Sequence, residues 1–257
     1  MLKDKVVVIT GASSGIGALA AKFLSEQGAI PVLVARSVEK LESVGAQLTG
    51  AHELIAMDVT QQEQVQQVID HVIQRYGKID VLLNNAGYGK FDSLLDMSVD
   101  DFSEMMNVNY LGTVRCTKAV LPYMLQRGEG HIVNVASMAA KIGTARSTSY
   151  TATKHAVYGF SNSLRQELRG TGITVSTVNP GPIDTPFFEL ADPSGNYISN
   201  IRWFIMKPEH VARKMVRLID RKQEEINLPW MAAVGMRMYQ LFPRLADKLT
   251  YRMMNKK

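Results

Sequence analysis

Near its amino terminus the chain reads Lys5-Val-Val-Val-Ile-Thr10-Gly-Ala-Ser-Ser-Gly-Ile-Gly17, a short apolar run that leads into a glycine-rich turn. The run predicts a buried strand, and the turn opens a predicted helix. Glycines let backbone approach a pyrophosphate, whose charge is then met by the free N–H groups of the helix amino terminus. The spacing G-x-x-x-G-x-G differs from the usual dinucleotide pattern, and a plain tight turn is the alternative. The position between a strand and a helix favours a phosphate site.

The rest of the chain repeats this alternation of short apolar runs and longer helical patterns. Such alternation predicts right-handed βαβ crossovers, and hence an α/β fold in which helices cover both faces of a parallel sheet. Ligands bind beyond the carboxyl ends of such strands, so residues that directly follow strands are the candidates for chemistry. Strands are predicted at Lys5–Thr10, Ile30–Ala35, His52–Met57, Ile79–Leu83, His131–Ala136, Ile173–Val178 and Glu225–Leu228, and helices near 15–27, 38–48, 61–76, 101–127, 150–169 and 208–222.

The composition excludes several classes of protein. The chain has 257 residues, 46% hydrophobic and 21% charged, which suits one large domain better than two small ones. Cys116 is the only cysteine, so an internal disulfide framework and Cys-rich zinc sites are excluded, and the five histidines show no metal-ligand spacing. No apolar stretch approaches the roughly 18 residues that span a bilayer, and we expect no signal peptide. These features predict a soluble cytoplasmic protein without a metal site.

The net charge of +5 is concentrated at the carboxyl terminus. Residues 228–257 carry six basic side chains and one acidic one, whereas residues 1–227 hold 23 of each kind. A neutral main body gives no support for nucleic-acid binding. Within residues 230–257, Met and Leu recur at three- and four-residue steps beside a basic row, which predicts an amphipathic helical extension. Such a helix can lie on an anionic membrane, but packing against its own domain or a second subunit is favoured.

Tyr150 and Lys154 stand four residues apart in a predicted helix, and Ser137 directly follows a predicted strand. The helical spacing places the phenol and the ammonium on one face. A nearby cation favours phenolate over phenol, so it lowers the tyrosine pKa from its ordinary value of roughly 10 toward neutrality. A tyrosine tuned in this way can act as a general acid or base. Taken alone, the pair is more often an ordinary surface contact.

Several motifs in the same order resemble the classical short-chain dehydrogenase/reductase family over about residues 4–229. The resemblance implies a single Rossmann-type, doubly wound domain, a nicotinamide cofactor, and hydride transfer between that cofactor and a carbonyl or alcohol. It also implies a homodimer or homotetramer built on the helices near 101–127 and 150–169. The motifs are Thr10 to Gly17, Asn84-Asn85-Ala86-Gly87, Asn109, Ser137, Tyr150, Lys154 and Asn179-Pro180-Gly181.

The resemblance also implies roles for four catalytic residues. Tyr150 would give its proton to the carbonyl oxygen, while Ser137 would hold that oxygen by a hydrogen bond. Lys154 would lower the tyrosine pKa and bind ribose hydroxyls. Asn109 would hold a water that relays protons to Lys154. From the residues alone, Ser137 could simply cap a turn, and Asn109 could bond to a local group.

The cofactor would lie along the carboxyl ends of the strands. By the same resemblance, Asp58 would accept a hydrogen bond from the adenine amino group, with Val59 beside it; an N-cap at Asp58 or Thr60 is the alternative. Ile183 and Thr185 would hold the nicotinamide carboxamide, in a loop that could otherwise be merely rigid. The full predicted set is Gly11, Ser13, Ser14, Gly15, Ile16, Gly17, Arg36, Asp58, Val59, Asn85, Ala86, Gly87, Tyr150, Lys154, Pro180, Gly181, Ile183 and Thr185.

The end of the second strand predicts which nicotinamide cofactor binds. Sites that prefer NAD place an acidic residue there, which binds the ribose 2′-hydroxyl and repels a 2′-phosphate. Here Ala35 occupies that place and Arg36 follows. A guanidinium suits phosphate, and Ser13, Ser14 and Ser37 could add hydrogen bonds. We therefore predict NADP(H), although Arg36 could be a solvated loop cation.

The substrate is less well defined by the sequence. We predict a catalytic domain at residues 1–229, a substrate lid at about 186–207, and the extension at 230–257. Aromatic residues of the lid could form an apolar wall of the substrate pocket, or they could pack the lid against the rest of the domain. Tyr88, Phe91, Met138 and Ile142 could face the same pocket. No charged anchor for a small acid or phosphate substrate stands out, although Lys141 and Arg146 remain possible.

Three classes of function remain open from the sequence. The favoured one is NADPH-dependent reduction of an apolar ketone or aldehyde, with 3-oxoacyl-[acyl carrier protein] reduction as its enzymatic rival. The second class is a non-catalytic NADP-binding regulator, which the intact catalytic set argues against. The third is a protein that binds a membrane surface or a partner through its carboxyl-terminal helix.

Overall fold

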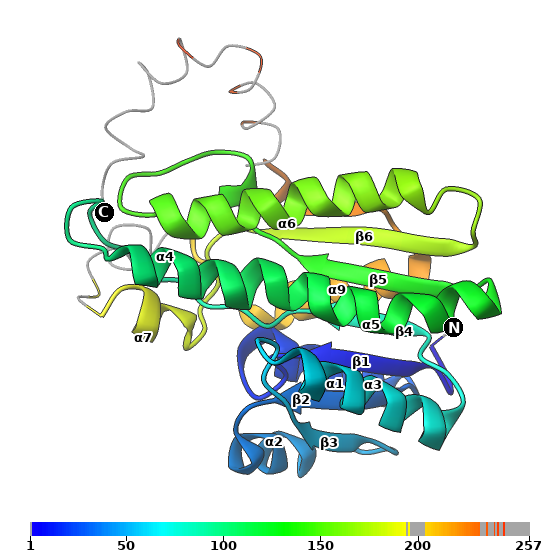
Figure 1. Ribbon diagram of the computed structural model, residues 1–257. Helices are drawn as coiled ribbons and strands as arrows, with labels where there is room; N and C mark the ends of the chain where they lie inside the picture. Colours follow the sequence, from blue (N-terminus) through cyan, green and yellow to red (C-terminus); the bar gives the residue numbers. More distant parts are fainter. Residues whose placement is uncertain are drawn as a thin grey trace.

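The fold is one sheet of seven parallel strands (Figure 1). The computed structural model describes residues 2–193, 195, 204–231, 235, 239, 241 and 244. The strand order is β3-β2-β1-β4-β5-β6-β7, which confirms the predicted fold class. The strands are β1 (Val6–Thr10), β2 (Ile30–Ala35), β3 (Glu53–Ala56), β4 (Val81–Asn84), β5 (Gly130–Val135), β6 (Ile173–Pro180) and β7 (Glu225–Leu228).

Helices cover both faces of this sheet. Val7 and Ile9 of β1 belong to the core beneath α1, α2 and α9, whereas Val6 and Val8 belong to the core beneath α3, α5 and α6. Figure 1 shows α3, α5 and α6 on the near face. Because both faces are buried, the strands read as nearly continuous apolar runs. The helices are α1 (Gly15–Glu26), α2 (Val38–Gly45), α3 (Gln62–Tyr76), α4 (Val99–Met106), α5 (Gly112–Arg127), α6 (Thr148–Glu167), α7 (Phe187–Ala191) and α9 (Pro208–Arg221).

The strand order places a binding crevice between β1 and β4. From β1 the chain builds outward through β2 and β3, then returns to the other side of β1 to form β4. At this switch point the connections leave β1 and β4 in opposite directions, so the loops at their carboxyl ends part. The predicted glycine turn follows β1 and the predicted Asn-Asn-Ala-Gly motif follows β4, so both motifs lie at the crevice.

The prediction of one continuous helix at 101–127 was wrong. It consists of α4, a π-helix η1 (Asn107–Leu111) and α5. The start moves to Val99 because Ser98 forms a capping box with Asp101, in which the Ser98 hydroxyl accepts from the Asp101 N–H at 3.1 Å. Arg115 donates to the Asn107 side chain at 2.8 Å and to its carbonyl at 3.3 Å, and the Asn109 side chain ties the wide turn to Tyr88 and Thr153 by tertiary hydrogen bonds. An apolar period cannot reveal such contacts.

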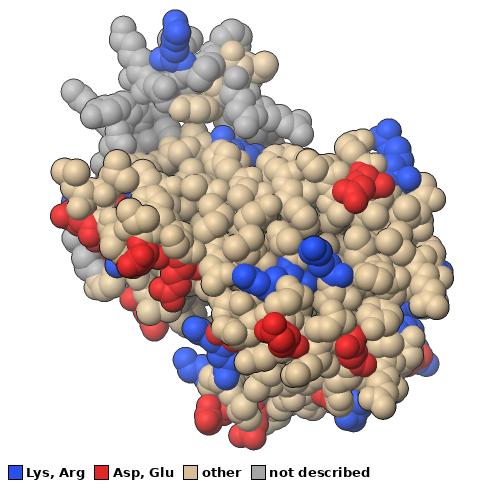
Figure 2. All heavy atoms as spheres, in the orientation of Figure 1, with Lys and Arg blue, Asp and Glu red and all other residues tan. Residues whose placement is uncertain are grey.

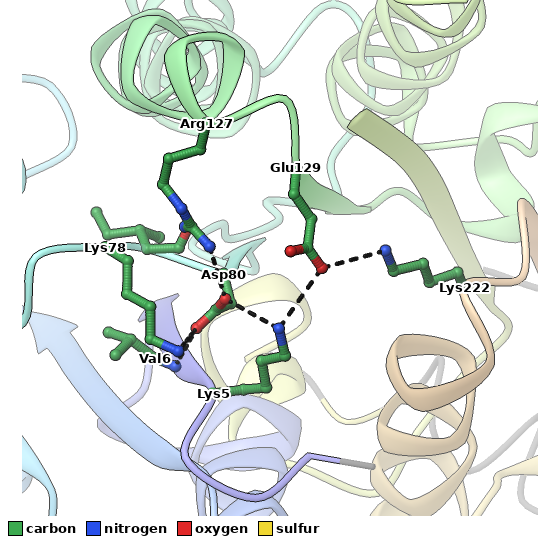
Figure 3. Close-up of polar contacts among 8 residues, drawn as sticks. Lys5, Val6, Lys78, Asp80, Arg127, Glu129 and Lys222 are labelled. Carbon is green, nitrogen blue, oxygen red and sulfur yellow. Dashed lines mark hydrogen bonds and ion pairs between the residues drawn. The ribbon is translucent and has the colours of Figure 1, made fainter. Parts of the chain in front are cut away.

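An ion-pair cluster centred on Asp80 lies at the amino ends of the strands, at the opposite end of the sheet from the crevice (Figure 3). The Asp80 side chain is 3% exposed and accepts from the Val6 N–H at 2.9 Å. Lys78, Lys5 and Arg127 contact the carboxylate at 2.9, 3.1 and 3.2 Å. Burial alone would raise the pKa of Asp80, but the Val6 N–H and the three cations outweigh it and hold the pKa below its ordinary value. The cluster ties together the starts of β1 and β4 and the end of α5.

Candidate active site

A cavity of about 1790 Å³ lies along the carboxyl ends of the strands. Its wall brings together residues that the sequence predicts for both the catalytic and the cofactor-binding sets. Two predicted residues, Gly17 and Asn109, do not reach the wall. The predicted residues that line it are Gly11, Ser13, Ser14, Gly15, Ile16, Arg36, Asp58, Val59, Asn85, Ala86, Gly87, Ser137, Tyr150, Lys154, Pro180, Gly181, Ile183 and Thr185.

The glycine turn is packed tightly against the loop after β4. Gly11 has a φ of +65°, and a Cβ there would lie 2.8 Å from the Ala86 Cα. A Cβ on Gly17 would lie 2.6 Å from the Gly11 carbonyl oxygen and would also collide with the Asn85 amide. That amide donates to the Thr10 and Gly11 carbonyls at 3.1 Å each, so Asn85 ties the two strand ends together. Gly17 therefore serves helix packing, whereas the sequence predicted a direct cofactor contact.

The amino terminus of α1 is suited to an anion. The helix begins at Gly15, and its N-cap Ser14 makes no side-chain capping hydrogen bond. The first-turn N–H groups have no intrahelical partners, and no acidic residue lies in this turn. Ser13, Ser14 and Ile16 line the cavity at the same place. Free donors and the helix dipole therefore fit the pyrophosphate of a dinucleotide.

Two cations line the cavity beyond the end of β2. Arg36 was predicted there; Lys40, one helical turn later in α2, was missed. Lys40 follows Arg36 by four residues, near the start of the predicted helix at 38–48, and this spacing could have indicated that the two cations lie on the same side. Ser37 also lines the cavity and was a candidate for a hydrogen bond to phosphate, but its hydroxyl caps α2: it accepts from the Lys40 N–H at 3.3 Å and donates to Glu39 at 2.8 Å. The O–H of Ser37 is therefore already donated to Glu39.

Asp58 lies on the wall after β3, beside Val59. One carboxylate oxygen accepts from the N–H and the hydroxyl of Thr60, at 2.9 and 2.8 Å, and so closes a local turn. The N-cap of α3 is Gln61, so the alternative that Asp58 or Thr60 caps this helix is wrong. The contact of Asp58 with adenine stays a prediction.

Lys154 lies buried beside Tyr150, as the helical spacing predicts. Its Nζ is 5.7 Å from the centroid of the Tyr150 ring and donates to the Val135 carbonyl at 2.9 Å. The lysine is 5% exposed, and this burial lowers its pKa from 10.5 to about 8. At neutral pH the ammonium form still predominates. A cation so placed favours the phenolate of Tyr150.

Ser137 follows β5 and lies on the same wall. Its hydroxyl donates to the Pro180 carbonyl at 3.3 Å and accepts from the Ala139 N–H at 3.0 Å. The second bond caps a short 3₁₀ turn, η2 (Met138–Ala140), so the local capping alternative is present in the structure. At 3.3 Å the bond to Pro180 is long for a hydroxyl donor and is therefore weak.

Asn109 is buried in η1 and bonds to the loop after β4. Its side-chain oxygen accepts from the Tyr88 N–H at 2.9 Å, and its amide donates to the Tyr88 carbonyl at 2.9 Å and to Thr153 at 3.0 Å. The side chain thus makes the local bonds that the sequence left as an alternative. Its role in a proton relay stays a prediction.

The loop after β6 completes the wall predicted for the nicotinamide. Gly181 donates to the Leu228 carbonyl at 2.7 Å, which fixes the loop to the end of β7. A Cβ on Gly15 would lie 3.6 Å from the Thr185 methyl, so this loop meets the glycine turn of α1. Pro180, which ends β6, and Gly181, Ile183 and Thr185 of this loop all line the cavity.

The remaining wall is mainly apolar. Tyr88, Phe91, Met138 and Ile142 line it, as predicted, together with Phe187, Phe188 and Phe204. Neither of the two possible charged anchors lines the cavity: Lys141 forms an ion pair with Glu225, and Arg146 lies in the loop before α6. Other predicted lid aromatics, Tyr197 and Trp203, and most of the predicted extension lie outside the described residues.

Within the described part of the chain, no cluster of His, Cys, Asp and Glu could hold a metal ion. In the same part, no helix is long and apolar enough to cross a bilayer. Cys116 is buried, and burial raises the pKa of its thiol to about 12.

The model of the family described as short chain dehydrogenase matches residues 5–194 of the chain. The chain belongs to the short-chain dehydrogenase family. It is an oxidoreductase, and the resemblance seen in its motifs is confirmed. An uncharacterized oxidoreductase of Staphylococcus epidermidis is 36% identical over 217 residues, which cover 82% of this chain and 94% of that protein.

Solved structures of this family are similar over most of the chain. An alcohol dehydrogenase from the archaeon Thermococcus sibiricus, complexed with 5-hydroxy-NADP, has 30% identity and a TM-score of 0.78 over 88% of this chain and 96% of that one. A variant of actinorhodin polyketide ketoreductase with NADPH has 30% identity and a TM-score of 0.79 over 88% of this chain and 95% of that one.

Proposed function

We propose that this short-chain dehydrogenase uses NADPH to reduce an apolar ketone or aldehyde to an alcohol. The observation that carries the proposal is the buried Lys154 beside Tyr150, on the wall of a cavity that also holds Ser137. The two similar solved structures contain 5-hydroxy-NADP and NADPH, which supports a nicotinamide cofactor here. When bound, that cofactor supplies the hydride.

The protein would supply the proton and the oxyanion contacts. Ser137 and Tyr150 would donate to the carbonyl oxygen, so that negative charge develops against donors already in place. Tyr150 would then transfer its proton to that oxygen. Because Lys154 is still cationic at neutral pH, it stabilises the resulting phenolate.

Two cations support NADP(H) over NAD(H). Arg36 and Lys40 line the cavity after β2, where Ala35 leaves no carboxylate to bind a 2′-hydroxyl. Arg36 can pair with a phosphate through two N–H groups, and Lys40 adds a second positive charge. We infer that both meet the 2′-phosphate.

The rim of the cavity favours a free carbonyl compound over a carrier-bound one. Asp96, before α4, and Asp100 and Glu104, within α4, are exposed, and Glu104 lines the cavity with Asp101. Acidic side chains gather at the left of Figure 2, where Figure 1 shows α4. Like charges repel, so this rim disfavours an acidic acyl carrier protein. Both signs of charge are scattered over the rest of the face in Figure 2, which gives no support for nucleic-acid binding.

We further propose that residues 1–229 form the catalytic domain and that it assembles as a homodimer or homotetramer. The likeness of 36% to a relative over 217 residues supports a single catalytic unit of this size. Size-exclusion chromatography with light scattering would decide the assembly, and a monomer at micromolar concentration would contradict it.

Replacement of Tyr150 by Phe tests the catalytic assignment. Turnover should fall by roughly a hundredfold or more, as is typical when an acid/base group is lost, while NADPH binding stays nearly unchanged. The assay is NADPH oxidation over a panel of apolar ketones and aldehydes. Tyr123→Phe is the matched control, because Tyr123 bonds to Asp70 away from the cavity. Near-normal turnover in Tyr150→Phe would refute the assignment.

Replacement of Arg36 by Ala tests the cofactor assignment. The Kd of NADPH should rise by roughly tenfold to a hundredfold, the cost of a hydrogen bond between charged groups, while the Kd of NADH changes little. Titration of cofactor fluorescence measures both constants. Arg217→Ala, at an exposed site on α9, is the control. Equal losses for the two cofactors would show that Arg36 does not contact the phosphate.

A further inference from the structure

Three aromatic rings from separate segments meet beside the proposed proton donor. The ring centroids of Tyr150 and Phe187 are 5.5 Å apart, those of Phe91 and Tyr150 are 5.8 Å apart, and those of Phe91 and Phe187 are 6.4 Å apart. These separations lie in the range of edge-to-face aromatic contacts. All three rings are partly exposed and line the cavity. We name these residues the aromatic triangle.

Phe187 holds its place in the triangle because residue 89 has no side chain. A Cβ on Gly89 would lie 2.6 Å from the Phe187 Cζ and 3.4 Å from the Ala191 Cβ. A methyl group at Gly89 would therefore displace the ring.

The backbone around Gly89 is fixed, so it cannot shift to make room. Asn109 bonds to both the N–H and the carbonyl of Tyr88, the preceding residue, at 2.9 Å each. On the other side, the Phe91 N–H donates to the Ala191 carbonyl at 2.8 Å and ties this loop to the end of α7. The place of Phe187 beside Tyr150 is thus set by Gly89 and by the bonds on either side of it.

We propose that Phe187, seated on Gly89, is a specificity-determining residue that selects planar, ring-bearing ketones. The inference rests on the proposed carbonyl reduction and names its substrate class. A flat ring attached to the carbonyl extends from the Tyr150 hydroxyl along the partly exposed faces and edges of Phe91 and Phe187, and gains aromatic contacts there. A flexible alkyl chain buries similar apolar area but makes no edge-to-face contact and loses more rotamer freedom.

The surrounding wall agrees with this class of substrate. Met138 and Ile142 follow the serine and are apolar, and Phe188 packs against Phe187 with centroids 5.3 Å apart. Met is deformable and fits irregular ring shapes. The aromatic triangle also packs the ring of Tyr150, so loss of Phe187 lowers turnover somewhat for every substrate. The discriminating quantity is therefore the ratio between two substrates.

The test compares α-tetralone with an acyclic methyl ketone of the same number of carbons, with NADPH as reductant. Wild-type kcat/KM should be at least about tenfold higher for α-tetralone, which corresponds to about 1.4 kcal/mol. Phe187→Leu and Gly89→Ala should both bring this ratio close to one. Gly159→Ala is the matched control for Gly89→Ala, because a Cβ on Gly159 meets nothing within 4 Å. It should leave the ratio unchanged.

Calorimetric binding of α-tetralone to the complex with NADP⁺ separates this inference from the proposed function. If the wild-type protein reduces no carbonyl compound, the proposed function fails. The Kd of α-tetralone, compared between wild type and the same variants, still tests the inference. A wild-type preference for the acyclic ketone would overturn the inference while leaving carbonyl reduction in place. A Gly89→Ala protein that behaves like Gly159→Ala would also overturn it. Phe187→Leu keeps apolar volume, so it serves if Gly89→Ala does not fold.

Discussion

Replacement of Lys154 by Met should stabilise the fold while it abolishes turnover. Burial lowers the pKa of this lysine from 10.5 to about 8. At about 1.36 kcal/mol per pKa unit, the buried charge costs about 3 kcal/mol of folding free energy. The variant keeps an apolar side chain of similar length but loses the 2.9 Å bond to the Val135 carbonyl, worth roughly 1 kcal/mol. The net gain in the free energy of unfolding should be about 2 kcal/mol at neutral pH.

The pH dependence of this gain has a definite sign. The folded-state pKa lies below the unfolded one, so between about pH 8 and 10.5 the unfolded chain binds more protons than the folded one. The charge penalty is complete below about pH 8 and disappears as the pH rises toward 10.5. The advantage of the Lys154→Met variant should therefore shrink over that range.

Urea unfolding of the cofactor-free protein, followed by circular dichroism, measures this difference at about pH 7 and again at about pH 10. Lys118→Met is the control: Lys118 is exposed on α5, and its replacement should change stability by no more than about 0.5 kcal/mol. A Lys154→Met protein less stable than wild type at neutral pH, or a gain that persists unchanged at alkaline pH, would refute the reasoning.

Two further predictions concern Asp80 and His131, two ionisable side chains that are buried away from the cavity. Asp80→Asn should lower the free energy of unfolding by about 3 kcal/mol in urea, since three cations lose a carboxylate that is 3% exposed. Because the folded pKa of Asp80 is depressed, its contribution is present above the unfolded pKa and is lost as pH falls; an Asn variant with unchanged acid sensitivity would contradict this. Burial lowers the pKa of His131 from 6.5 to about 4, so the unfolded chain binds a proton that the folded one cannot. Wild type should lose about 2 kcal/mol between about pH 7 and pH 5, and His131→Gln should not; equal losses in urea titrations would refute the assignment.

The sheet and the positions of its loops were predictable because they depend on local patterns. Apolar runs predicted all seven strands to within about two residues at either end, since burial on both faces leaves a continuous signature. The glycine turn after β1 and Ser137 after β5 were placed by the same alternation. A parallel sheet brings the carboxyl ends of its strands to one edge, so these separate motifs had to meet.

Other features depend on segments far apart in the chain. The π-helix at Asn109 is held by contacts with Tyr88 and Thr153, which no helical period encodes. The contact of Phe187 with Gly89 joins residues nearly a hundred positions apart. From the lid sequence alone, its aromatic residues could either form a wall of the substrate pocket or hold the lid against the domain. Ser37 was a candidate for a bond to phosphate, although its place directly before the predicted helix at 38–48 also suits a helix cap, and the structure shows the cap.

The sequence by itself determined the α/β fold, the family and the pairing of Tyr150 with Lys154, because each is a matter of spacing along one element or of order along the chain. Tertiary structure decided how deeply Lys154 is buried and therefore that its pKa falls to about 8. It also decided that Phe187 lies against Tyr150. Burial and close contact arise only when several elements pack together, so these properties belong to the assembled fold.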